Sequence, residues 1–166
     1  MPYRVVGATT DPARPEGERD DCAVWALSHA LSVSYATAHA TLAAQGRTVG
    51  QGTLDQHWKV AASVLGYHVE SMNSSLGIFQ GVRRLGKYSD ALGPFASVYD
   101  EGIYLISTCR TRPGGDNPSH LMAVVDGVVY DSGADAEWLN DWPPAKMSHA
   151  RQRVWSAWRL LPVRAT

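Results

Sequence analysis

Cys22 stands where a thiol could act as a nucleophile. Two acidic cap candidates, Asp20 and Asp21, precede it, and an apolar stripe of helical spacing follows it: Ala23, Ala26, Leu27, Ala30 and Leu31. This pattern predicts a buried helix over residues 21–31 with the thiol in its first turn. Unpaired N–H groups and a partial positive charge at a helix start favour the thiolate form of cysteine. Cysteines at such positions often have only a packing role. A catalytic role for Cys22 would also need a histidine to take its proton and a third group to orient that histidine.

A predicted hairpin brings a histidine and an aspartate together. Residues 120–125 and 128–131 flank Asp126-Gly127, a pair typical of a two-residue hairpin turn. Pairing outward from this turn, with side chains alternating between faces, places His120 and Asp131 on one face as diagonal neighbours. Such neighbours are roughly 7–8 Å apart at the backbone, within reach of an imidazole and a carboxylate. We therefore predict that Asp131 orients His120, whose second ring nitrogen faces a thiol.

The other acids and histidines fit structural roles better. Asp126 is roughly 20 Å from His120 at about 3.3 Å per residue, so we interpret it as a turn residue. Asp131 itself could alternatively be a turn or surface acid. His29 is roughly 10 Å along the helix from Cys22 at 1.5 Å per residue, too far for direct proton transfer. The remaining assignments are a satisfied core histidine for His39, a spare thiol for Cys109, and surface or packing roles for His57, His68 and His149.

The elements that must position these residues are helices first and strands second. Ser34 is expected to cap a second helix, and Thr53 a third, with Leu54 on its buried side. From Gly102 the pattern changes to strands, and the predicted strands cover residues 67–72, 103–108, 120–125, 128–131 and 154–163. A short helix within residues 89–99 and a loop at 110–118, either a substrate-gating flap or an ordinary connection, complete the prediction. We expect one α+β domain over residues 1–166, with N-terminal helices packed on a C-terminal antiparallel sheet.

Composition excludes several classes of protein. The chain has 166 residues, 45% apolar and 19% charged, with a net charge of −1, as in a single globular domain. There is no basic stripe for nucleic acid and no apolar run of the roughly 18 residues that span a membrane. The N-terminus lacks the layout of a signal peptide, and two cysteines are too few for a disulfide framework. We expect a cytoplasmic protein without a metal or other cofactor.

Four segments together resemble the papain-like cysteine peptidase superfamily, in particular its small bacterial and phage-encoded members. They are Asp21-Cys22-Ala23-Val24-Trp25-Ala26-Leu27, Gly50-Gln51-Gly52-Thr53, residues 102–107 and residues 120–131. The resemblance covers most of residues 20–132 and implies a papain-like fold. Carried over position by position, it implies Cys22 as nucleophile, His120 as general base and acid, and Asp131 as the orienting residue.

One segment departs from the papain-like pattern. These enzymes usually have a Gln a few residues before the cysteine, whose amide helps to hold the oxyanion. Here residues 16–21 contain neither Gln nor Asn, and a carboxylate there would repel a negative oxygen. The backbone N–H of Cys22 can supply one donor, and Arg19 is the candidate for a second.

These features lead to one principal expectation and three alternatives. The principal one is a cysteine-dependent peptidase or isopeptidase that acts on a peptide or protein through a thioester acyl-enzyme, without a cofactor. The alternatives are a catalytically inactive papain-like module that binds a protein, an acyl transferase, and a cell-wall amidase of the same Cys-His chemistry. The sequence leaves the oligomeric state open.

Overall fold

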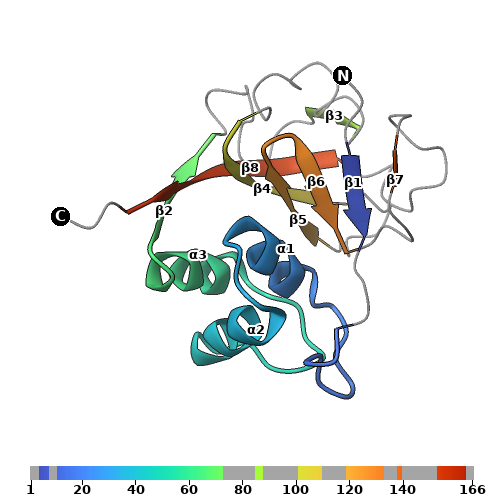
Figure 1. Cartoon of the computed structure of the whole chain (residues 1–166), viewed down its shortest axis with the longest axis vertical. Helices are drawn as coiled ribbons and strands as arrows, with labels where there is room; N and C mark the ends of the chain where they lie inside the picture. Colours follow the sequence, from blue (N-terminus) through green and yellow to red (C-terminus); the bar gives the residue numbers. More distant parts are fainter. Residues whose placement is uncertain are drawn as a thin grey trace, which may run out of the picture.

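The chain folds into helices that pack on one side of a sheet (Figure 1). The structure, a computed structural model, describes residues 4–7, 11–72, 85–87, 101–109, 119–132, 138–139 and 153–163. The helices in these residues are α1 (Cys22–Ala30), α2 (Tyr35–Ala44) and α3 (Asp55–Val64). The strands are β1 (Arg4–Gly7), β2 (Tyr67–Ser71), β3 (Leu85–Lys87), β4 (Ile103–Cys109), β5 (Ser119–Val125), β6 (Val128–Asp131), β7 (Trp138–Leu139) and β8 (Arg153–Pro162).

The sheet has the order β2-β8-β4-β5-β6-β1-β7, and β3 pairs with β8. The five strands from β2 to β6 in this order pair antiparallel, which confirms the predicted α+β class. At one edge the N-terminal strand β1 adds a parallel pair with β6, which the predicted C-terminal antiparallel sheet did not include. The edge of β6 away from β5 is open to β1, and the N-terminal segment occupies it before the chain enters the helices.

The hairpin between β5 and β6 has the predicted register. Val125 pairs with Val128 across the turn, and Ala123 pairs with Tyr130. Asp126 and Gly127 have φ values of 47° and 78°, so both turn residues are left-handed, as in a type I′ turn. The twist of this turn matches that of the strands, so the local Asp-Gly signal is sufficient to fix which residues face each other.

The predicted capping residue is correct for α2 and wrong for α3. Ser34 caps α2 as predicted, since its hydroxyl accepts a hydrogen bond of 3.0 Å from the Thr37 N–H. Thr53 does not cap α3, because its hydroxyl accepts a bond of 3.0 Å from Arg47 Nε. The N-cap position of α3 is instead Leu54, which has no side-chain cap bond and is 60% exposed, contrary to its expected burial. Leu54 precedes the first turn and so does not share the apolar face of this helix.

The core lies between the helices and the sheet, and α1 is its centre. The side chains of α1 from Ala23 to Leu27 are all buried, and this helix lies against β5 and β6. They pack with apolar side chains from all three helices and from β4, β5 and β8, including Leu42, Trp58, Leu105, Leu121 and Trp158. Burying one large apolar side chain contributes roughly 1.5–3 kcal/mol. The helix that carries Cys22 is therefore the most deeply buried of the three described helices.

Three predictions lie outside the described residues, namely the short helix within residues 89–99, the loop at 110–118 and the surface or packing role of His149. Within the part of the chain that the structure describes, none of the helices has both the length and the hydrophobicity needed to cross a bilayer.

Candidate active site

Cys22 is the first residue of α1, as predicted, and it is half-buried. The helix begins here because the carbonyl of Asp21 accepts hydrogen bonds from the N–H groups of Val24 at 2.9 Å and Trp25 at 3.2 Å. Cys22 is a free thiol. Its sulfur is thus carried at the end of a helix whose following residues are fixed in the core.

His120 and Asp131 meet across the β5–β6 hairpin. His120 Nε2 and Asp131 Oδ1 are 2.6 Å apart, the distance of a strong, charge-assisted hydrogen bond. The side chain of Asp131 is 0% exposed and that of His120 is 11% exposed. The diagonal placement agrees with the one derived from the hairpin register, whereas the catalytic roles of both residues remain predictions.

The imidazole of His120 also forms a hydrogen bond with the side chain of Cys22. Because Nε2 is bonded to Asp131, Nδ1 is the ring nitrogen that the sulfur can reach. Burial lowers the pKa of His120, but the hydrogen bonds and charges of Asp131 and Cys22 outweigh burial and raise this pKa to about 10. The direction of this shift favours the protonated ring.

Stacked rings fix α1 on the hairpin. The rings of His29 and Tyr130 lie 4.3 Å apart at 16°, and the rings of Trp25 and His29 lie 6.1 Å apart at 17°. Burial lowers the pKa of His29, which favours the neutral ring in this stack. Tyr130 directly precedes Asp131, so the stack holds the helix that carries Cys22 beside the strand that carries the acid. Sequence reasoning excluded His29 from catalysis but did not find this role.

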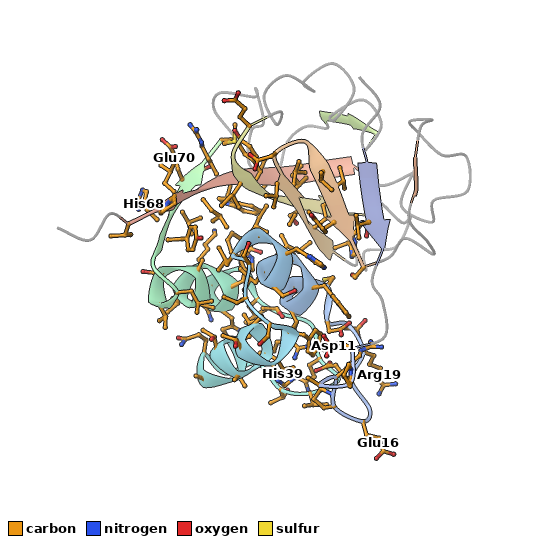
Figure 2. All side chains as sticks on the ribbon, in the orientation of Figure 1. Asp11, Glu16, Arg19, His39, His68 and Glu70 are labelled. Atoms are coloured by element: carbon orange, nitrogen blue, oxygen red, sulfur yellow. The ribbon has the colours of Figure 1, made fainter. Side chains whose placement is uncertain are left out.

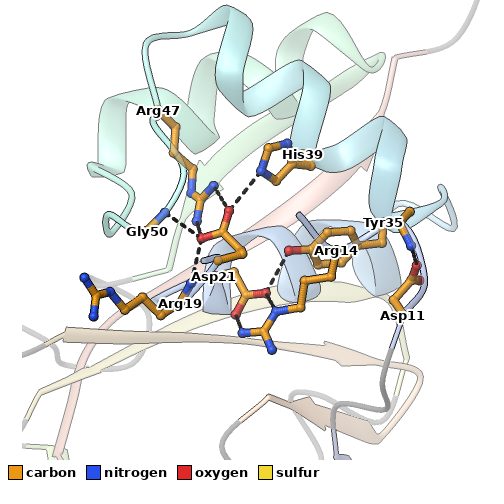
Figure 3. Close-up of polar contacts among 10 residues, drawn as sticks. Asp11, Arg14, Arg19, Asp21, Tyr35, His39, Arg47 and Gly50 are labelled. Carbon is orange, nitrogen blue, oxygen red and sulfur yellow. Dashed lines mark hydrogen bonds and ion pairs between the residues drawn. The ribbon is translucent and has the colours of Figure 1, made fainter. Parts of the chain in front are cut away.

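Asp21 does not cap α1 with its side chain, although it occupies the N-cap position. Its carboxylate accepts hydrogen bonds from Arg14 Nε at 2.9 Å and Nη2 at 3.2 Å, and from the Tyr35 hydroxyl at 2.7 Å. Figure 3 shows this carboxylate between the two donors. The side chain of Asp21 is 8% exposed, and that of Arg14 is 40% exposed. The carboxylate next to Cys22 is thus hydrogen-bonded to the preceding loop and to α2, and not to the start of α1.

Glu18 is a second buried acid in the segment before Cys22. Its side chain is 0% exposed and pairs with Arg47, which is 1% exposed, through two hydrogen bonds of 2.9 Å. It also accepts bonds from the backbone N–H groups of Arg19 and Gly50, both at 3.0 Å, and it lies 2.9 Å from His39 Nε2 (Figure 3). Burial alone would raise the pKa of Glu18, but these bonds lower it to about 2. Glu18 therefore joins the segment before Cys22 to α2 and to the loop after it.

Four other residues considered from the sequence are Arg19, Asp126, His68 and Cys109. Arg19 is exposed, and in Figure 2 its side chain points outward from the loop before α1. Among the described contacts none joins its guanidinium to Cys22, so its part in holding an oxyanion remains a prediction. Asp126 Oδ1 accepts a bond of 2.8 Å from the Gly102 N–H, which fits its turn role. His68 is exposed on β2, and the side chain of Cys109 lies outside the described residues.

No group of three or more His, Cys, Asp and Glu side chains in the described ranges could hold a metal ion. No protein-family model matches this sequence, and no curated protein is significantly similar to it.

Proposed function

We propose that this protein is a cysteine-dependent hydrolase, a peptidase or isopeptidase, in which Cys22, His120 and Asp131 act together. The observation that carries the proposal is the double bonding of one imidazole. His120 is 2.6 Å from a fully buried carboxylate and is also hydrogen-bonded to a thiol at a helix start. A histidine oriented by an acid and facing a thiol is the arrangement that activates a sulfur nucleophile.

Acylation begins with the thiol proton on His120. The sulfur of Cys22 attacks the carbonyl carbon of an amide, so that a C–S bond forms and the carbonyl oxygen becomes negative. The backbone N–H of Cys22 can donate to this oxygen. When the tetrahedral intermediate collapses, the C–N bond breaks and His120 gives its proton to the leaving amine.

The charge on Cys22 links the two roles of His120. When Cys22 is ionised, its charge is one of the causes that raise the pKa of His120, and this charge disappears when the sulfur becomes a thioester. The pKa of His120 therefore falls during acylation, which makes the ring a better acid when the amine needs a proton. The neutral ring that remains can then deprotonate a water molecule, whose oxygen bonds to the carbonyl carbon; the C–S bond breaks, the acid is released, and Cys22 leaves as a thiolate beside the protonated ring.

The resemblance to papain-like peptidases supports this proposal, and it suggests a peptide or protein substrate and a reaction without a cofactor. An acyl transferase would use the same thioester and resolve it with an amine in place of water. A catalytically inactive binding module would need no activated thiol. The state of the thiol therefore separates the enzymatic proposals from this last alternative.

The test measures the alkylation rate of Cys22 by iodoacetamide against pH, in a Cys109→Ser background so that one thiol reacts. At about pH 6, where an ordinary thiol with a pKa of 8.5 is mostly protonated, we expect the unmodified site to react at least roughly tenfold faster than His120→Ala. His68→Ala, which removes an exposed histidine, should react like the unmodified site. Equal rates in all three proteins would argue against catalysis.

A second measurement tests acyl transfer itself. An activated ester should leave an acyl group on Cys22 that intact-mass spectrometry detects, and His120→Ala should not accumulate it. If the thiol is activated but no acyl-enzyme forms from esters or peptides, the hydrolase proposal fails.

A further inference from the structure

Asp21 places a carboxylate one residue before the proposed nucleophile, at a position where acids normally cap a helix. An N-cap aspartate usually accepts a hydrogen bond from the N–H of the second or third helical residue. In α1 that place would put a negative charge beside the sulfur of Cys22. It would also occupy donors at the helix start, where a developing oxyanion needs them. The side chain of Asp21 makes no cap bond and is bonded elsewhere.

The alternative partners of Asp21 are built into the fold. Tyr35, at the start of α2, is 3% exposed and donates the shortest of the three bonds, at 2.7 Å. Arg14 approaches from the loop before α1 and supplies two donors at 2.9 and 3.2 Å. A guanidinium in this two-donor geometry cancels the charge of the carboxylate and fixes its direction.

We propose that Asp21 is a positioning residue and that Arg14 and Tyr35 hold its carboxylate off the first turn of α1, so that the helix start stays open to negative charge at Cys22. The inference rests on the proposed function, since the charge in question is the oxyanion of acyl transfer. Residues 16–21 contain no Gln or Asn that could hold the oxyanion, and in this proposal Asp21 instead helps to keep the backbone donors of the helix start available. Arg14 neutralises this aspartate from outside the first turn.

The test compares two alkylating reagents of similar size, the iodoacetate anion and neutral iodoacetamide, on Cys22 in the Cys109→Ser background. The thiolate fraction affects both rates equally. The ratio of the iodoacetate rate to the iodoacetamide rate therefore reports the charge beside the sulfur, and it falls when that charge becomes more negative. Arg14→Met leaves the carboxylate of Asp21 without its cation, and we expect the ratio to fall by about threefold to tenfold at low salt. Added salt should reduce this effect.

Four further variants check the assignment. Asp21→Asn should raise the ratio, because it leaves the arginine without its anion, and the double variant Arg14→Met/Asp21→Asn should return it to within about twofold of the unmodified value. Arg14→Lys keeps the charge and should preserve most of the ratio. Arg159→Met, an exposed arginine on β8, should leave it unchanged. If Arg14→Met does not fold, Asp21→Asn alone decides the matter.

An unchanged ratio in both Arg14→Met and Asp21→Asn, or a double variant that stays at the Arg14→Met value, would overturn the inference. The outcome is separable from that of the proposed function. If His120→Ala slows alkylation while the ratio ignores Arg14, the hydrolase proposal stands and the role of Asp21 does not. If His120→Ala has no effect, the hydrolase proposal fails, although the ratio can still be measured.

Discussion

The buried carboxylate of Glu18 is expected to make a large contribution to the unfolding free energy, and Glu18→Gln tests this. Glu18 pairs with Arg47, accepts two backbone N–H groups and contacts His39, while its own side chain is 0% exposed. Glu18→Gln keeps the size of the side chain and removes its charge. It therefore leaves a buried guanidinium, 1% exposed, without a countercharge.

The magnitude follows from the pKa of Glu18. A pKa that falls from 4.5 in the unfolded chain to about 2 in the fold corresponds to about 3 kcal/mol of unfolding free energy at neutral pH. Removing one partner of a buried ion pair typically costs about 3–5 kcal/mol, because the other charge stays buried. Both arguments lead to an expected loss of about 3–5 kcal/mol at pH 7 for Glu18→Gln.

The pH dependence has a definite sign. Because the folded pKa lies below the unfolded value of 4.5, the contribution of Glu18 is present above that pH and is lost as the pH falls toward 2. Urea denaturation followed by tryptophan fluorescence should show the difference between the protein and Glu18→Gln shrinking over this range. Glu16→Gln, an exposed acid of the same loop, should change the unfolding free energy by no more than about 0.5 kcal/mol.

The pair can be isolated with Arg47→Met and the double variant Glu18→Gln/Arg47→Met. The double variant should lose less than the sum of the two single losses, since neither charge is then left alone. A loss below about 1 kcal/mol for Glu18→Gln, or additive losses, would refute the reasoning, because the carboxylate would then contribute no more than an ordinary surface pair.

Two further variants, Asp131→Asn and Gly127→Ala, test the hairpin. Asp131→Asn should lower the pKa of His120 in an NMR titration, since the hydrogen bond and charge of Asp131 raise it; an unchanged titration would remove Asp131 from the site. Because the pKa of His120 is raised from 6.5 to about 10, its contribution to stability is present below pH 6.5 and is lost as the pH rises toward 10, and Asp131→Asn should weaken this loss. Gly127→Ala should cost about 1–2 kcal/mol in urea denaturation because φ is 78° there; a neutral effect would mean that the turn can relax.

The sequence predicted those parts of the fold that depend on near neighbours along the chain. The apolar stripe after Cys22, the cap at Ser34 and the Asp126-Gly127 turn each reflect interactions over a few residues, and each has its predicted structure. The contact of His120 with Asp131 could be derived because the turn determines the register. Thr53 was assigned wrongly because Arg47, six positions earlier in the loop after α2, donates to its hydroxyl, which therefore does not cap the helix.

The rest of the site depends on partners that no local pattern identifies. Glu18 and Arg47 are 29 positions apart, and Asp21 and Tyr35 are 14 apart, so their pairing follows only when the helices have packed. The parallel pairing of β1 is hidden for the same reason, because a four-residue strand carries no information on which edge it joins. Sequence patterns found the residues proposed for chemistry, but not the contacts that hold the chain before Cys22.

These contacts change the interpretation of Glu18 and Asp21, the two buried acids before the thiol. On the sequence alone, carboxylates in residues 16–21 count against an oxyanion at Cys22. In the fold Asp20 adopts a left-handed conformation with φ of 58°, between Glu18, which is bonded to the loop after α2, and Asp21, which is bonded to Arg14 and Tyr35. Glu18 pairs with Arg47, and Asp21 pairs with Arg14. The chain before the nucleophile is thus anchored on both sides of Asp20 by ion pairs, so that the buried carboxylates of Glu18 and Asp21 are each neutralised by an arginine before Cys22 becomes charged.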